Sequence, residues 1–117
     1  MTILIVDDNA GMRRMLRRAL PASATSVFDI SDGSAALAAY TAIRPDVVLM
    51  DIRMPTVDGL AATRAIRGVD PNARIIIVTD YDDEQLRAAA AESGACAYFL
   101  KQNLTGLAEL IEAVTGS

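Results

Sequence analysis

Four short apolar segments of this chain each end in polar or charged residues. Continuous apolar runs rich in Val, Ile and Leu are typical of strands that a parallel sheet buries on both faces. Parallel strands bring their carboxyl ends to one edge of the sheet, which is where open α/β sheets bind ligands. We therefore expect the polar residues that end the four runs to meet in one crevice. They are Asp7 and Asp8, Asp51, Thr79, and Lys101.

The segments between these runs have helical spacing or turn chemistry. Repeated strand–helix units with right-handed crossovers form a doubly wound parallel sheet with helices on both faces, so the expected fold class is α/β. Strands are expected over 2–7, 25–30, 46–51, 74–79 and 96–100. Helices are expected between Asn9 and Pro21 and over 34–43, 58–68, 83–93 and 104–114. Residues 1–117 therefore read as one domain without an internal repeat.

Several residues mark the expected ends of the helices. Either Asp8 or Asn9 can cap the first helix, and Asp58 can cap the third. Gly68 and Gly94 are expected to end the third and fourth helices. The inward face of the first helix is expected to consist of its regularly spaced apolar residues, which are Met12, Met15, Leu16, Ala19 and Leu20.

Composition limits the functions that this chain can have. Its 15 acidic and 11 basic residues give a net charge of −4, so it offers no electrostatic case for direct nucleic-acid binding. No apolar stretch approaches the ~20 residues needed to span a bilayer, so we expect no membrane insertion. The single cysteine, Cys96, cannot form an internal disulfide and is expected to be a small core residue. A reducing, cytoplasmic location is therefore expected.

Histidine is absent from the sequence. This absence excludes Ser-His and Cys-His catalysis, the commonest zinc sites, and phosphate carried on an imidazole of the chain itself. Chemistry in the expected crevice must therefore use carboxylates, a hydroxyl, a lysine and groups that a partner brings.

The aspartates of the expected crevice favour a hard divalent metal. Ionised carboxylates repel one another unless a cation lies between them, and a few oxygen ligands suit Mg²⁺ or Mn²⁺ rather than Zn²⁺. We expect Asp8 and Asp51 to bind the ion and Asp7 to orient a bound water or to bind directly. The Arg53 backbone carbonyl is placed to complete the set. Since neighbouring strand residues face opposite ways, Asp7 and Asp8 can converge only if the strand ends before them.

A metal-bound Asp51 can act as a nucleophile toward a phosphoryl group and form an acyl phosphate. Catalysis of such a transfer is mostly positioning and charge neutralisation. The metal takes one phosphoryl oxygen, the Lys101 ammonium a second, and the Thr79 hydroxyl with nearby backbone N–H groups the third. An added charge of about −1.5 to −2 is enough to draw Thr79 inward.

Each of these residues also has an ordinary structural interpretation. Asp8 is a common kind of helix cap, Lys101 alone would be a solvated surface lysine, and Thr79 is an ordinary strand-end residue. Asp51 after an apolar strand is harder to explain by packing alone. The occurrence of all four at the expected strand ends favours a functional site.

Four motifs resemble those of the receiver domain of bacterial two-component response regulators: ILIVDDN, DVVLMDIRMPTVDG, IIIVTD and AYFLK. The resemblance covers the whole chain. It implies a flavodoxin-like fold, with five parallel strands in the order 2-1-3-4-5 flanked by five helices. It also implies that Asp51 is the phospho-acceptor. Asp7 and Asp8 match the acid pair for Mg²⁺, with the Arg53 carbonyl as a third ligand.

The resemblance extends to the phosphate-binding and switch residues, with two departures. Thr79 and Lys101 match the phosphate-binding pair, and Tyr98 matches the aromatic residue whose ring moves with Thr79 on activation. The departures are Asp80, where the family usually has a small residue beside the phosphorylation site, and Gln102, where proline is frequent. A cis bond before Gln102 would cost about 2.5–4 kcal/mol, so we expect it to be trans.

The absence of histidine makes the phosphoryl donor a separate protein. The resemblance implies a sensor histidine kinase or a histidine phosphotransfer protein that docks on the first helix and the loop after the fifth strand. The arginines on the polar face of that helix are either solvated or contact an acidic partner; they are Arg13, Arg14, Arg17 and Arg18. The alanine run at 88–91 either packs on the sheet or meets an output domain, an effector protein or a second protomer on phosphorylation.

These observations favour a phosphorylation-dependent signalling switch, which is an enzyme only toward its own modification and its hydrolysis. An aspartyl-phosphate hydrolase is less favoured, because such enzymes carry a second Asp where this chain has Arg53. A receiver-shaped binding module that works without phosphorylation is made credible by Asp80. Flavin binding has the least support, since no phosphate loop rich in Ser, Thr and Gly follows the first strand.

Overall fold

The computed structural model of the chain describes residues 1–116, which form a five-stranded sheet, five α-helices and one 3₁₀ helix. The strands are β1 (Thr2–Val6), β2 (Ser26–Ile30), β3 (Val47–Met50), β4 (Ile75–Thr79) and β5 (Ala97–Leu100). The α-helices are α1 (Ala10–Arg18), α2 (Ala36–Ile43), α3 (Gly59–Val69), α4 (Glu84–Ser93) and α5 (Leu107–Thr115), and the 3₁₀ helix η1 (Gly33–Ala35) precedes α2. None of these helices is long and apolar enough to cross a membrane.

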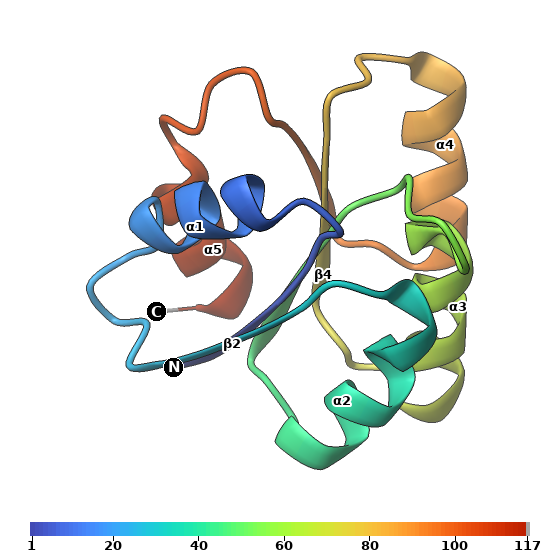
Figure 1. Ribbon diagram of the computed structural model, residues 1–117, viewed down its shortest axis with the longest axis horizontal. Coiled ribbons are helices and arrows are strands. Elements are labelled where there is room, and N and C mark those ends of the chain that lie inside the picture. Colours follow the sequence, from blue (N-terminus) through green and yellow to red (C-terminus); the bar gives the residue numbers. More distant parts are fainter. Residues whose placement is uncertain (117) are drawn as a thin grey trace.

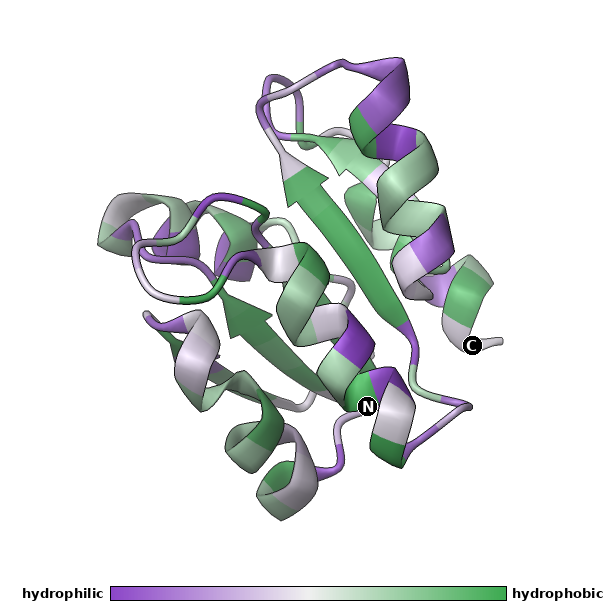
Figure 2. Cartoon of the chain, turned by 90° about the vertical axis from the view of Figure 1, so that its right-hand side faces the viewer, coloured by the Kyte–Doolittle hydropathy of each residue, from purple (hydrophilic) through white to green (hydrophobic). Residues whose placement is uncertain are grey.

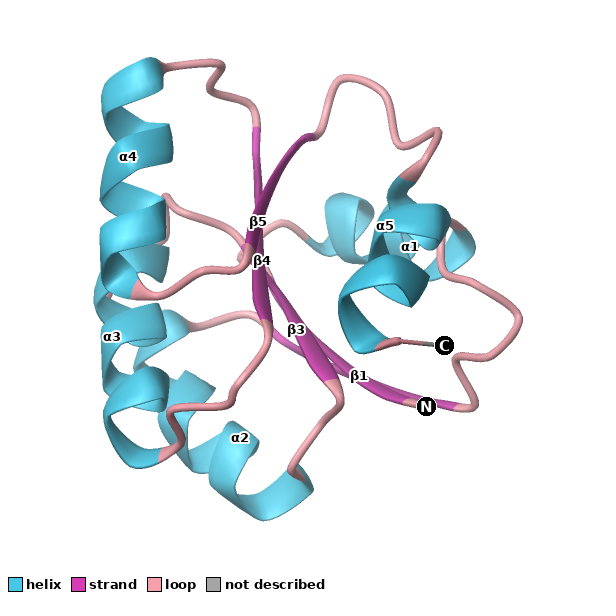
Figure 3. Cartoon of the chain, turned by 180° about the vertical axis from the view of Figure 1, so that it is seen from behind, coloured by secondary structure: helices cyan, strands magenta, loops and turns pink. Residues whose placement is uncertain are grey.

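All neighbouring strands are parallel, and their order is β2-β1-β3-β4-β5. Helices α1 and α5 cover one face of the sheet, whereas α2, α3 and α4 cover the other (Figure 1 and Figure 3). Val6, the last residue of β1, is in register with Ile30 of β2 and Met50 of β3, so these three strands end at one level. The doubly wound α/β fold and the expected strand order are confirmed.

Two apolar layers lie on either side of the sheet. All residues of β3 and β4 are buried, and β1 is buried from Ile3 onward. Because successive strand residues face opposite ways, Leu4 and Val48 pack toward α2, α3 and α4, whereas Ile3 and Leu49 pack toward α1 and α5. Figure 2 shows hydrophobic strands between helices, with hydrophilic residues on the helices and in the loops.

Three expected helix caps are present. Asn9 Oδ1 accepts a 2.8 Å hydrogen bond from Met12 N and caps α1. Asp58 Oδ1 accepts one of the same length from Ala61 N and caps α3. Gly94 ends α4 in the left-handed conformation, with a φ of 106° that glycine adopts without a steric penalty. The two N-caps fix where the loops that follow β1 and β3 at the carboxyl edge of the sheet end.

Three helix boundaries differ from expectation, and the first is the end of α1, which lies at Arg18 rather than at Pro21. Gly68 does not end α3, because the Asp70 N–H still makes a helical hydrogen bond and the helix runs through Gly68. Helix α5 begins at Leu107 rather than at residue 104, because the preceding segment is a turn in which the Asn103 side chain accepts a backbone hydrogen bond. Glycine and apolar spacing indicate roughly where a helix can end or begin, but local hydrogen bonds determine the residue at which it does so.

Two residues expected in the core are exposed. Met15 is 50% exposed, because it lies at the margin of the apolar face of α1; Met12 and Leu16 do pack against the core. Cys96 is also exposed, since it precedes β5 at the edge of the sheet opposite the acidic residues. Helical spacing and residue type predict the centre of a buried face better than its limits.

The start of α3 packs so closely on the segment that follows β3 that Gly59→Ala should destabilise the fold. A Cβ at Gly59 would lie 1.9 Å from the Asp51 carbonyl oxygen, so the backbone must shift. We expect Gly59→Ala to lower the free energy of unfolding by about 1–3 kcal/mol in urea titrations. Gly68→Ala, in the same helix and with no atom within 4 Å of its Cβ, should instead raise it by about 0.4–1 kcal/mol. Equal unfolding midpoints for the two variants would contradict this packing.

Candidate functional site

Three carboxylates meet where β1 and β3 end. Strand β1 stops at Val6, so Asp7 and Asp8 lie beyond the pleat and are free to converge, as the expected site requires. The Asp51 N–H donates to the Val6 carbonyl at 2.9 Å, which sets Asp51 beside them. One oxygen from each of Asp7, Asp8 and Asp51 lies within 4.8 Å of the others. Asp7 and Asp51 are buried, whereas Asp8 is exposed.

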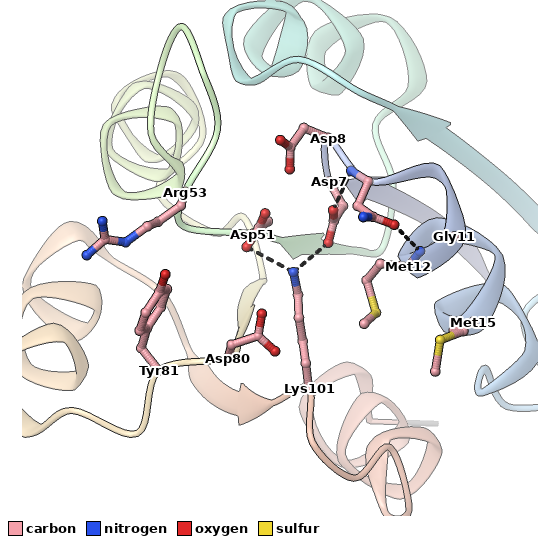
Figure 4. Close-up of a pocket in the computed structure, with 11 residues that line it drawn as sticks. Asp7, Asp8, Gly11, Met12, Met15, Asp51, Arg53, Asp80, Tyr81 and Lys101 are labelled. Carbon is pink, nitrogen blue, oxygen red and sulfur yellow. Dashed lines mark hydrogen bonds and ion pairs between the residues drawn. The ribbon is translucent and has the colours of Figure 1, made fainter.

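Lys101 supplies the positive charge within this group. Its backbone N–H donates to the Thr79 carbonyl at 2.8 Å, which places it directly after β5 at the same edge of the sheet. Its Nζ lies 2.8 Å from Asp7 Oδ2 and 3.1 Å from Asp51 Oδ1, and only 7% of the side chain is exposed. Figure 4 shows the ammonium between the two carboxylates. The bond from Lys101 to Gln102 is trans, as expected.

Burial and repulsion set the charge states in the site. The pKa of Asp51 is raised to about 6, chiefly by burial and then by the charge of Asp7, while Lys101 opposes both. Burial alone would lower the pKa of Lys101, but its contact with Asp7 and the charge of Asp51 outweigh that effect and raise it. The lysine is therefore an ammonium, and the three carboxylates of Asp7, Asp8 and Asp51 outnumber it by two.

The surroundings of Asp7 fit an oxygen-ligated cation. Its Oδ1 accepts a 2.9 Å hydrogen bond from Asn9 N. Its Oδ2 is buried and has no hydrogen-bond partner of good geometry within residues 1–116; it faces only the Lys101 ammonium. A buried carboxylate oxygen with free lone pairs, next to two further carboxylates, suits a small hard divalent ion such as Mg²⁺ or Mn²⁺.

The carboxylates open into a pocket of about 420 Å³. Met12 and Met15 of α1 form one wall, and Arg53 and Tyr81 form the opposite wall (Figure 4). The Arg53 guanidinium lies 4.6 Å from the centroid of the Tyr81 ring, a cation–π contact. Asp80 is exposed and lines the same pocket, where it adds a fourth carboxylate. The methionine wall was not expected, because helical spacing assigned Met15 to the core.

Thr79 and Tyr98 lie beside this pocket rather than in its wall. Thr79 is 1% exposed, and its Oγ1 accepts a 3.3 Å hydrogen bond from Tyr81 N. The Tyr98 hydroxyl donates to the Tyr81 carbonyl at 2.7 Å. Both side chains therefore hold the same residue of the β4–α4 loop, one by its N–H and the other by its carbonyl.

The arginines of α1 do not form one solvated face. Arg14 and Arg18 are exposed, as expected. Arg17 Nε instead lies 2.7 Å from Asp29 Oδ2, and the Arg13 side chain, only 19% exposed, lies 3.4 Å from Asp29 Oδ1. Sequence spacing could not show this, because Asp29 comes from a neighbouring strand.

Comparison with known proteins identifies the family of this chain. The model of the response regulator receiver domain matches residues 3–115. The chain belongs to the response regulator receiver domain family. Among curated relatives of this receiver domain, sporulation initiation phosphotransferase F of Bacillus subtilis is 35% identical over 99 residues, which are 85% of this chain and 80% of that protein. Regulatory protein AtoC of Escherichia coli is 38% identical over 99 residues, and the receiver domain spans only 22% of its length.

Solved structures match the receiver domain over nearly its whole length. A LuxR-family two-component response regulator from Aurantimonas sp. SI85-9A1 has a TM-score of 0.92 and 33% identity, covering 98% of this chain and 84% of its own. CheY in a CheX–CheY–BeF₃–Mg complex from Borrelia burgdorferi has a TM-score of 0.90 and 26% identity, covering 97% and 88%. Membership of this family is consistent with phosphorylation-dependent signalling.

Proposed function

We propose that residues 1–117 act as one receiver domain in which Asp51 accepts a phosphoryl group from a phosphohistidine. One observation carries the proposal: the buried Asp51 carboxylate faces an open pocket that also holds Asp7, Asp8 and the Lys101 ammonium. The chain has no histidine, so the donor is a sensor histidine kinase or a histidine phosphotransfer protein. The matched relative named as a phosphotransferase supports this class of partner.

In this proposal, the acidic group holds a divalent metal. Asp7, Asp8 and Asp51, with the Arg53 backbone carbonyl, would hold Mg²⁺ or Mn²⁺. When bound, such an ion neutralises charge on the oxygens of the transferring phosphoryl group. The buried Oδ2 of Asp7 and the surplus of carboxylates over ammonium groups both support this assignment.

The transfer itself is a displacement at phosphorus. An Asp51 carboxylate oxygen forms a bond to phosphorus while the phosphorus–nitrogen bond to the donor imidazole breaks, and the imidazole leaves with the electron pair and takes up a proton. The Lys101 ammonium binds one phosphoryl oxygen and the Thr79 hydroxyl a second. Water later cleaves the acyl phosphate and regenerates the carboxylate, so the domain acts only on its own modification.

Phosphorylation would change the surface formed by the β4–α4 loop and the Tyr98 ring through Tyr81. A phosphate on Asp51 adds about 1.5–2 negative charges and draws the Thr79 hydroxyl inward as a donor. The Tyr81 N–H then loses its acceptor, and the Tyr98 hydroxyl is bonded to the carbonyl of that same residue. The loop and the Tyr98 ring would therefore move together between two packings, which an effector or output domain can distinguish.

Acetyl phosphate with Mg²⁺ tests the proposal without a kinase. The wild-type chain should form a retarded, acid-labile species on a phosphate-affinity gel, whereas Asp51→Asn and an EDTA-treated sample should not. Asp80→Asn, which removes a different carboxylate from the same pocket, should still be labelled. Equal labelling of wild type and Asp51→Asn would refute Asp51 as the acceptor.

Asp80 favours a second candidate function, a binding module that works without phosphorylation, because its charge repels an entering phosphoryl donor. If the domain is a phospho-acceptor, Asp80→Ala should be labelled by acetyl phosphate several-fold faster than wild type, as removal of one like charge near the reacting oxygens lowers the barrier. Glu92→Ala removes the same charge from an exposed site on α4 and should leave the rate unchanged. No labelling of wild type or Asp80→Ala would favour the second function.

Arg14 and Arg18 are exposed arginines of α1 that, unlike Arg13 and Arg17, are not paired with Asp29, and we propose that they contact an acidic surface of the donor protein. A double reversal to glutamate should slow phosphotransfer from the phosphorylated kinase by about tenfold, through lost electrostatic steering. Labelling by acetyl phosphate should not change. Reversal of Arg64 and Arg74, exposed elsewhere, serves as the matched control. Equal losses with both donors would rule out a docking role.

A further inference from the structure

The Arg13 guanidinium lies against the backbone of the acidic group rather than in solvent. Its Nη1 donates a 2.7 Å hydrogen bond to the Asp7 carbonyl oxygen, and its Nε lies 3.4 Å from Asp29 Oδ1. One side chain therefore joins α1 to the end of β1 and to β2.

The Asp7 carbonyl needs this donor because the β-ladder ends one residue earlier. Val6 is the last residue of β1 in register with its neighbours, and its carbonyl accepts the Asp51 N–H. The Asp7 N–H still donates to the Ile30 carbonyl at 3.1 Å, but no backbone amide of residues 1–116 donates to the Asp7 carbonyl. Asp7 is 1% exposed, and an unpaired buried carbonyl costs about 1–3 kcal/mol.

The position of Asp8 depends on the same peptide unit. The Asp7 carbonyl belongs to the planar unit that joins Asp7 to Asp8, so fixing its direction fixes the position of the Asp8 Cα, from which the side chain extends. Within the described part of the chain, no hydrogen bond or ion pair holds the Asp8 carboxylate itself. Its oxygen nevertheless lies within 4.8 Å of those of Asp7 and Asp51. The contacts that restrain this segment are therefore those of Asp7, namely the Arg13 hydrogen bond to its carbonyl and the Asn9 N–H donated to its Oδ1.

We propose that Arg13 is a positioning residue that holds the Asp7–Asp8 peptide so that Asp8 faces Asp51. Asp29 anchors Arg13 in turn, because its other carboxylate oxygen is held by Arg17 at 2.7 Å. This inference rests on the proposed function, in which the three carboxylates hold a divalent metal. It assigns an arginine outside the pocket wall to the geometry of that metal site.

Calorimetric titration of Mg²⁺ into the unphosphorylated chain tests this role directly. Residues that orient metal ligands typically change metal affinity by about 10–100-fold, so Arg13→Gln should bind Mg²⁺ about tenfold more weakly than wild type. Arg13→Lys should fall between them, since one ammonium cannot hold both the Asp7 carbonyl and Asp29. Arg64→Gln removes the same charge from an exposed position on α3 and should bind within about twofold of wild type.

Amide NMR spectra separate positioning from a loss of folding. Arg13→Gln should keep the wild-type spectrum except around Asp7 and Asp8. A folded Arg13→Gln variant that binds Mg²⁺ no more weakly than Arg64→Gln would overturn the positioning role. The proposed function would still stand in that case if the wild-type chain is labelled at Asp51. If Arg13→Gln does not fold, Asp29→Asn keeps Arg13 but removes its anchor, and wild-type affinity in that variant would overturn the role equally. Absence of Mg²⁺ binding by wild type would overturn both proposals.

Discussion

Lys101→Met is expected to lower the free energy of unfolding of the metal-free chain by about 3–5 kcal/mol, because it leaves buried carboxylates without their cation. The Lys101 side chain is 7% exposed, and its ammonium is the partner of both Asp7 Oδ2 and Asp51 Oδ1. Methionine keeps most of the side-chain volume, so the loss reports charge rather than packing. Urea titration in EDTA measures the effect. Arg64→Met, at an exposed site, should change stability by no more than about 0.5 kcal/mol.

Mg²⁺ should restore more stability to Lys101→Met than to wild type. The ammonium and a metal ion compete for the same carboxylate oxygens, so removal of the lysine relieves that competition while phosphoryl labelling still falls. Lys101 is the only lysine in the sequence, so selectively labelled lysine gives one side-chain NMR signal that should shift as wild type binds Mg²⁺. An unmoved lysine signal during the titration, or equal stabilisation of both proteins by Mg²⁺, would contradict a shared site.

Asp51→Asn is expected to be more stable than wild type at neutral pH without metal. The pKa of Asp51 is raised from 3.8 to about 6 in the folded chain, chiefly by burial and by the charge of Asp7. The folded state therefore binds more protons than the unfolded state between about pH 4 and pH 6, and wild type loses stability as the pH rises through that window. The accumulated cost is about 2–3 kcal/mol above pH 7, and asparagine avoids it.

The pH dependence and the metal dependence identify the cause of this effect. Unfolding titrations in EDTA should show the advantage of Asp51→Asn at pH 7.5 and only a small one near pH 4, where the wild-type carboxyl is protonated in the folded state and about half protonated in the unfolded state. Mg²⁺ should remove the advantage at pH 7.5 by stabilising the ionised wild-type site. A stability difference that is the same at both pH values would mean that asparagine acts through packing instead.

The meeting of Asp7, Asp8, Asp51 and Lys101 could be predicted from the sequence, because it depends only on strand direction. Each follows an apolar run, and parallel strands bring such ends to one edge whatever the loops do. The convergence of Asp7 and Asp8 required the first strand to end before them, and β1 does end at Val6, one residue short of the expected strand 2–7. The strand order came from the resemblance, since apolar spacing does not say which strands are neighbours.

The sequence could not predict side-chain contacts between elements that are distant along the chain. Arg13 has the spacing of a polar face, yet its partners are a carbonyl at the end of β1 and Asp29 on β2. Met15 has the spacing of a core residue, yet it lies at the margin of the α1 face and lines the pocket. Thr79 follows the expected pattern, but only the structure shows that its hydroxyl is bonded to Tyr81 and lies outside the pocket wall.

Reductive trapping of the phosphorylated chain tests most directly which residue accepts the phosphoryl group. Borohydride converts an aspartyl phosphate to homoserine, so the residue that carried phosphorus is marked permanently and can be located by tandem mass spectrometry. After reaction with acetyl phosphate and Mg²⁺, homoserine should appear at position 51 and not at 7, 8 or 80. Homoserine at another of these carboxylates, or at none of them in a sample that binds Mg²⁺, would contradict the assignment of Asp51 as the phospho-acceptor.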